Sequence, residues 1–161
     1  MKPDADAAAD DGRNETEHER LDRNWLEILQ ELRVVQTGTQ ILTGFLLTLV
    51  FQQRFTELDA FQVDIYLVLV SLAALATVLA LTPVSLHRAL FRQGAKLQIV
   101  RFANIILVLT LAVVGLTLAG TTLLVFDVVL GHAAGIIACV TTLVLSAAAW
   151  VFLPLFARHR S

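Results

Sequence analysis

Chemically reactive motifs are scarce in this sequence, and their absence narrows the functions to consider. The one cysteine, Cys139, lies in an apolar run, where it can build neither a disulfide framework nor a metal cluster. No glycine-rich phosphate loop, zinc motif or nucleophile elbow occurs. No basic tract of the kind that binds nucleic acid occurs either. We therefore expect neither an enzyme nor a nucleic-acid-binding protein, and no metal or cofactor.

Charge is also scarce, and it is unevenly distributed. Of the 161 residues, 16% are charged and 57% are hydrophobic, and the mean hydropathy is +0.72. Most charged residues precede Val34, and the others gather at short breaks between long apolar runs. This composition departs from that of a soluble domain. Because a bilayer requires such segregation of charge, the sequence predicts an integral membrane protein.

The lengths of the apolar runs predict how many helices cross the membrane. A span needs about 20 largely apolar residues, because the hydrocarbon core is about 30 Å thick and each helical residue rises about 1.5 Å. The predicted fold class is all-α, a membrane four-helix bundle at residues 21–161 that follows a disordered acidic tail at 1–20. The predicted spans are about residues 34–52, 64–82, 102–126 and 132–153.

Local signals mark where two of these helices begin. Asn24 with Glu27 is a plausible capping box for the helix that leads into the first span. Asp59 with Gln62 is a start signal for the second helix. Pro83 predicts that the second helix stops or kinks there, because the residue before a proline is biased away from the helical conformation.

The basic residues predict the orientation of the bundle. Of the twelve Lys and Arg residues, the first break, at 52–63, holds only Arg54, and the third, at 127–131, holds none. The second break, its flanks and the two ends of the chain hold the others. Under the positive-inside rule, both termini and the middle loop are cytoplasmic.

Polar side chains recur at steps of three and four along the first span, so they share one face of a helix. Gln40 lies about 9 Å inward from Val34, at about 1.5 Å per residue, close to mid-membrane. An amide that faces lipid is unsatisfied, so this face is expected to turn toward other helices or a wet cavity. It would serve as hydrogen-bonding glue, with Asn104, Thr110 or Thr117 as candidate partners, or as a hydrated track for an ion or small solute. The face comprises Arg33, Gln36, Gln40, Thr43 or the adjacent Gly44, Thr48 and Gln52.

Small residues line one face of the fourth span. Gly131 and Gly135 open this stripe with a four-residue spacing that permits close approach of another helix. Packing within one subunit is the favoured role, and a dimer seam is the alternative.

Ionisable residues gather at both ends of the predicted bundle. At the outer rim lie Asp64, Asp127 and His132, where salt bridging or helix capping is the ordinary role and proton pickup by Asp127 with His132 is the alternative. At the cytoplasmic end, Glu27 and Glu31 lie one turn apart and repel unless a partner neutralises them. We expect an electrostatic tie to the basic middle loop, with metal binding by these carboxylates and a loop histidine as a weaker alternative. This cytoplasmic cluster comprises Glu27, Glu31, His87, Arg88 and Arg92.

Two segments resemble an uncharacterised family of small four-span membrane proteins from actinobacteria. They are RNWLEILQELRVVQTGTQILTGFLLTLVFQQRF at 23–55 and TPVSLHRALFR at 82–92. The resemblance covers most of the chain after the acidic tail and implies four spans in a bacterial plasma membrane. Members are often labelled sodium:proton antiporters, a label that carries over no catalytic residue.

Two roles are consistent with these features. The first is a membrane structural or interaction protein, with the lipid bilayer and further copies of the chain as candidate partners. The second, which the resemblance implies, is a small oligomeric cation or proton transporter. Ion-coupled carriers usually need an ionisable group deep in the membrane. Because no Asp or Glu lies near the middle of any predicted span, the sequence favours the first role.

Overall fold

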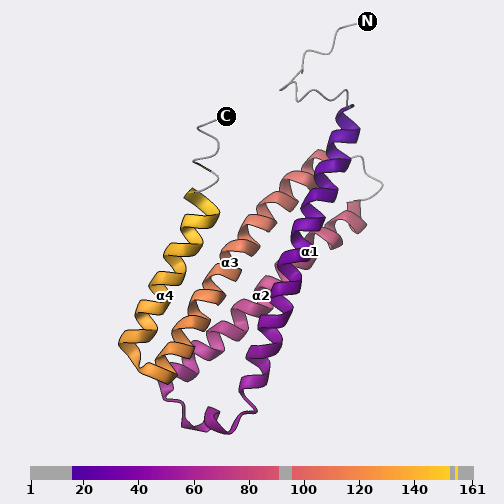
Figure 1. Ribbon diagram of the computed structural model, residues 1–161. Coiled ribbons are helices and arrows are strands. Elements are labelled where there is room, and N and C mark those ends of the chain that lie inside the picture. Colours follow the sequence, from indigo (N-terminus) through magenta and orange to yellow (C-terminus); the bar gives the residue numbers. More distant parts are fainter. Residues whose placement is uncertain (1–15, 91–95, 153–154, 156–161) are drawn as a thin grey trace, which may run out of the picture.

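The computed structural model describes residues 16–90, 96–152 and 155, and every regular element in these ranges is a helix (Figure 1). This confirms the all-α class. The elements are α1 (Glu17–Leu49), the 3₁₀ turn η1 (Gln53–Glu57), α2 (Ala60–Leu90), α3 (Lys96–Leu130), α4 (His132–Ala147) and the π-helical turn η2 (Ala148–Phe152).

The helices form an antiparallel bundle around α3. This helix packs against each of the other three long helices, and Figure 1 shows α1 and α4 on opposite sides of it. One end of the bundle holds η1 and the turn between α3 and α4. The other end holds the start of α1, the end of α2, the start of α3 and the end of η2 (Figure 1).

Among the described residues, three helical segments are long and apolar enough to cross a membrane: Ala60–Leu86, Ile99–Leu130 and His132–Phe152. They contain the spans predicted at 64–82, 102–126 and, apart from residue 153, which lies outside the described residues, 132–153. The span predicted at 34–52 lies mostly in α1, whose many polar side chains lower its hydropathy, so a fourth crossing stays a prediction.

The outer surface of these helices is that of a protein in lipid. Ile137 and Leu145 on α4 are 67% and 64% exposed. In the most apolar 18-residue stretch of His132–Phe152, only 6% is buried within the chain. Soluble proteins rarely leave apolar patches of this kind in contact with water.

The first helix begins earlier than the sequence signals indicate. Thr16 is its N-cap: the Thr16 hydroxyl accepts a hydrogen bond from the Glu19 backbone N–H (3.4 Å), and the Glu19 carboxylate accepts one from the Thr16 backbone N–H (2.9 Å). The Glu19 carboxylate also accepts a hydrogen bond from the Thr16 hydroxyl (2.8 Å). The two bonds that this carboxylate accepts, the one from the Thr16 backbone N–H first, lower the pKa of the Glu19 carboxyl. Asn24 therefore lies inside α1, and so do four residues of the predicted tail, 17–20. Residues 1–15 of the tail lie outside the described residues.

Two helices run past their predicted ends. Of the stop or kink predicted at Pro83, the stop is wrong: α2 continues to Leu90, with the Pro83 side chain fully buried. Because proline has no backbone N–H, α2 continues past Pro83 without one of its backbone hydrogen bonds. The helix α3 continues to Leu130, so the predicted break at 127–131 shrinks to Gly131, which adopts a φ of 92° that favours glycine.

The core follows an apolar seam on α1, where buried residues recur at spacings of four and seven. The end of this seam near the start of α1 packs against Ala80, Ala103 and Leu107 of α2 and α3. The other end packs against Tyr66, Leu69, Ala73 and Leu124, near η1. Among the side chains of α1 that the structure describes, the buried ones are Leu21, Ile28, Leu32, Thr39 and Leu46.

Candidate functional site

A buried carboxylate lies where α2, α3 and α4 meet. Asp127, in the last turn of α3, is 4% exposed. Its Oδ1 accepts a hydrogen bond from the Gln62 side-chain amide (2.7 Å), and its Oδ2 is hydrogen-bonded to Nδ1 of His132. Gln62 also forms a reciprocal pair with Asp59: the Gln62 backbone N–H donates to Asp59 Oδ1 (2.9 Å) and the Asp59 N–H donates to Gln62 Oε1 (3.1 Å). We call these four residues the Asp127 cluster.

The ends of neighbouring antiparallel helices bring this cluster together. Gln62 lies in the first turn of α2 and Asp127 in the last turn of α3, so the two meet at one end of the bundle. His132 opens α4 directly after the turn, and its ring packs edge-to-face on Phe61 with centroids 5.1 Å apart. Sequence reasoning singled out Asp127 and His132 but missed Gln62 as their partner. The helix-start signal at Asp59 places Gln62 at this depth and is the clue that could have found it.

Gly135 lets α4 approach α3 closely beside Asp127. A Cβ on Gly135 would come within 2.9 Å of both the Asp127 Cβ and the Leu123 carbonyl oxygen. Gly131 has nothing within 4 Å of its Cβ position and instead forms the turn through its positive φ. Of the two glycines singled out for helix packing, Gly135 contacts α3, and Gly131 forms the turn between α3 and α4.

The other ionisable residues from the sequence stay apart from this cluster. Asp64 is exposed on α2. At the opposite end, Glu27 pairs with Arg23 one turn earlier (3.2 Å), which neutralises one of the two neighbouring carboxylates locally. Glu31 and Arg88 are exposed. The side chain of His87, and all of Arg92, lie outside what the structure describes. In the described part of the chain, no group of three His, Cys, Asp or Glu side chains is placed to hold a metal ion.

The polar face of α1 lies on the outside of the bundle. Arg33, Gln40 and Thr48 are exposed, and Gln36 and Thr43 are half-buried. Gln36 and Thr43 border the apolar seam through which α1 contacts α2 and α3. Within one chain, the expectation that this face turns toward the other helices is therefore not met for Arg33, Gln40 and Thr48. Gln52, the last residue of the predicted face, lies beyond α1 as the N-cap of η1.

The candidate partners for this face are engaged elsewhere or point away. Asn104 is exposed. Thr110 and Thr117 are buried, and their hydroxyls donate to carbonyl oxygens of their own helix, those of Ile106 (2.7 Å) and Val113 (2.8 Å). Both hydroxyls are thus satisfied without a contact to α1.

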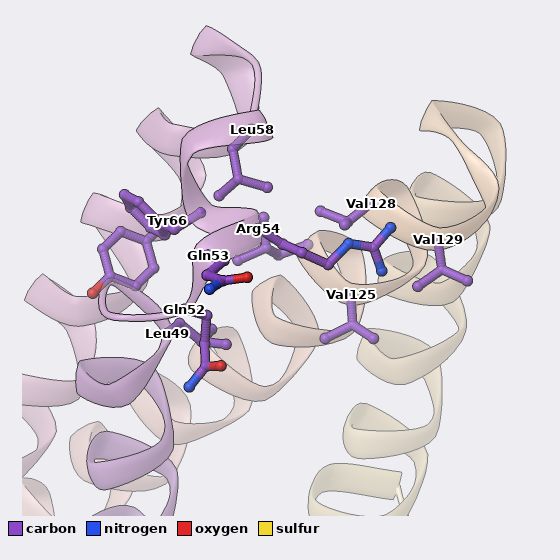
Figure 2. A pocket seen from close by; sticks show the side chains of 11 residues that line it. Leu49, Gln52, Gln53, Arg54, Leu58, Tyr66, Val125, Val128 and Val129 are labelled. Carbon is purple, nitrogen blue, oxygen red and sulfur yellow. The ribbon is translucent and has the colours of Figure 1, made fainter.

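A cavity of about 470 Å³ lies between η1 and the end of α3 (Figure 2). Its inner wall includes the buried Tyr66 and Leu124, and its polar rim comes from η1 and the residue before it. Sequence reasoning missed this cavity, because the break at 52–63 carries no periodic pattern that shows how it folds. The cavity is lined by Leu49, Gln52, Gln53, Arg54, Phe55, Leu58, Tyr66, Leu124, Val125, Val128 and Val129.

An all-helical bundle with three membrane-length apolar helices and a lipid-compatible exterior defines a helical membrane protein. The chain belongs to DUF6328, a family of unknown function, whose sequence profile matches residues 14–154. The expectation of an uncharacterised family is thereby confirmed. No curated protein and no solved structure matches the chain.

Proposed function

We propose that the protein is a structural or interaction protein of a bacterial plasma membrane, with four spans and both termini in the cytoplasm. Copies of the chain associate through the polar face of α1. The observation that carries the proposal is the exposure of the Gln40 side-chain amide on this face in a single chain.

The exposed side of α1 mixes groups that suit lipid with groups that do not. Ile41 is 72% exposed and Phe45 is 51% exposed, as in a helix that meets hydrocarbon. The adjacent side-chain amides of Gln36 and Gln40 make no hydrogen bond in the described part of the chain. Moving an amide into hydrocarbon without a partner costs about 4–8 kcal/mol on the cyclohexane scale. A second protein surface on this face removes that cost.

The same face has room for another helix. A Cβ added at Gly44 meets nothing within 4 Å. The hydroxyls of Thr37 and Thr48 donate to carbonyl oxygens of their own helix, those of Arg33 (2.9 Å) and Gly44 (2.8 Å). Small residues and satisfied hydroxyls permit close approach of two backbones. The amides are then the groups within the predicted span that need an outside partner.

A second copy of the chain suits this requirement because a glutamine amide both donates and accepts. About a two-fold axis, Gln40 of each copy can donate to Gln40 of the other. Polar contacts between membrane helices contribute about 0.6–2 kcal/mol each, so packing at Gly44 supplies the remainder.

Gly44→Leu tests this assembly. The new side chain points into open space in one chain, so the monomer stays folded, but it blocks a close helix approach. In mild detergent, we expect light scattering to give a dimer or larger assembly for wild type and a monomer for Gly44→Leu. Gln40→Leu should weaken association roughly 3- to 30-fold, the equivalent of one interhelical polar contact.

Ala74→Leu is the matched control, since Ala74 is exposed on α2 and this change should leave the assembly intact. Cysteine cross-linking in native membranes, with Thr37→Cys in a Cys139→Ala background, provides a detergent-free measurement. A chain that stays uncross-linked there, with Gly44→Leu eluting like wild type, would overturn the proposal.

Cation or proton exchange is the second candidate role. The observation behind it is the Asp127–His132 pair, in which a buried carboxylate contacts a histidine side chain that is 61% exposed. A sodium gradient imposed on liposomes that contain a pH dye separates the two roles. We expect no flux above that of empty vesicles; flux that Asp127→Asn abolishes would establish exchange instead.

A further inference from the structure

The cavity beside η1 has the composition of a site for a hydrocarbon chain. Its volume, about 470 Å³, falls in the range of about 300–1,000 Å³ typical of ligand sites. Tyr66 is 5% exposed and Leu124 is 4% exposed, and together they close the inner side. Phe55 packs edge-to-face on Tyr66, with ring centroids 4.9 Å apart, so the connecting segment is held over the cavity by an aromatic contact.

The cavity opens toward a surface that contacts lipid. Val125 and Val129, on its outer side, are 42% and 69% exposed. Both belong to α3, one of the helices apolar enough to cross a membrane. An acyl chain can therefore enter sideways from the bilayer, without first passing through water.

Arg54 is the one cation among the residues that line the cavity. Figure 2 shows its side chain extended toward Val125, Val128 and Val129. Its ion pair with Glu57 is long, Nε to Oε2 3.8 Å, and the two side chains are 81% and 71% exposed. Such an exposed pair contributes little, so the guanidinium is available to a better partner. A phosphate matches the guanidinium fork and forms charge-assisted hydrogen bonds with it.

We propose that this cavity binds one anionic phospholipid, with an acyl chain between η1 and α3 and the headgroup phosphate on Arg54. The amides of Gln52 and Gln53 at the same rim offer further donors to the headgroup. A zwitterionic lipid carries the same chain and phosphate together with its own compensating cation. The signature of the site is therefore a preference for net negative charge. This inference rests on the membrane location of the helices and does not require assembly through α1.

Lipid retention tests the proposal. The protein is purified in mild non-ionic detergent with phosphatidylglycerol or phosphatidylcholine of identical acyl chains, and bound lipid is counted by native mass spectrometry. We expect wild type to retain one phosphatidylglycerol in preference to phosphatidylcholine. Arg54→Gln should reduce that preference about tenfold, the effect of one charge-assisted contact. Glu57→Gln, which removes the competing carboxylate, should increase it.

Val128→Trp tests the cavity itself. The indole fills the space and should abolish retention of both lipids. Val108→Trp is the matched control, because Val108 is 57% exposed on the same helix but does not line the cavity. Leu58→Trp fills the cavity from the opposite wall and should give the same loss if Val128→Trp proves unstable.

Equal retention of the two lipids by wild type, or full retention by both cavity-filling variants, would overturn the proposal. The oligomeric state of each variant is measured in parallel, so that loss of lipid and loss of assembly are separated. Arg33→Gln, at the other end of the polar face, should leave lipid preference unchanged.

Discussion

The Asp127 side chain links three helices, because it lies on α3 and is hydrogen-bonded to one residue of α2 and one of α4. A carboxylate with 4% exposure is costly unless its oxygens are hydrogen-bonded, and Asp127 meets this condition with one partner from α2 and one from α4. Asp64, on the exposed side of α2, lies in no such arrangement. We therefore expect these two aspartates, which lie near the same end of the bundle, to contribute differently to the stability of the fold.

Asp127→Ala should destabilise the bundle by about 1–3 kcal/mol, because it leaves the Gln62 amide without its acceptor. Asp64→Ala should stay within about 0.5 kcal/mol of wild type, as is usual for exposed positions. Denaturant unfolding in detergent, followed by circular dichroism, measures both. Equal losses of unfolding free energy for the two variants would contradict the conclusion that Asp127 stabilises the contact between α2, α3 and α4.

At the scale of the elements, α4 depends on its contact with α3. Only 6% of the most apolar stretch of His132–Phe152 is buried within the chain, so most of the surface of α4 is available to contact lipid. Close approach occurs at Gly135, which packs on Asp127 and on the backbone at Leu123. In α1, by contrast, the apolar seam packs on α2 and α3, and the exposed side carries polar residues such as Gln40 and Thr48.

Gly135→Ala should separate α4 from α3, because the added methyl lies 2.9 Å from a carbonyl oxygen that cannot move without the helix. We expect a loss of about 1–3 kcal/mol, the usual cost of overpacking. Gly38→Ala is the control: it adds the same methyl in open space and should stabilise α1 by up to about 1 kcal/mol through helix propensity. Thermal unfolding of the two variants and wild type in detergent, at one protein concentration, compares them. A neutral Gly135→Ala would show that the contact is looser than described.

At the scale of the whole molecule, four antiparallel helices place the start of α1 and the end of η2 at one end of the bundle (Figure 1). The distribution of basic residues predicts which side of the membrane this end faces. Arg54 is the only Lys or Arg in the break at 52–63, and none lies at 127–131.

Reporter fusions test this orientation. Alkaline phosphatase inserted at Thr56 or after Gly131 should be active, because the positive-inside rule places both outside the cytoplasm. A fluorescent protein at the C-terminus should be bright, since it folds in the cytoplasm. A cytoplasmic reporter signal at Thr56 would contradict this orientation.

Local and compositional properties of this protein could be predicted from its sequence. The helical class and three apolar spans follow from run length and hydropathy, because a helix in hydrocarbon satisfies its own backbone. The start of α2 follows from Asp59 and Gln62, which are three residues apart. The start of α1 was missed because two capping patterns compete within a few residues and only one is used.

The sequence by itself determined that this chain is helical, that it enters a membrane and where its charge lies, because these depend on neighbours along the chain. Only the tertiary structure decided that the Gln40 amide of α1 faces outward, that Gln62 reaches Asp127 and that η1 covers a cavity. Each of these depends on which surfaces of distant segments pack together. An amphipathic helix with two usable faces does not reveal that choice until its partners are in place.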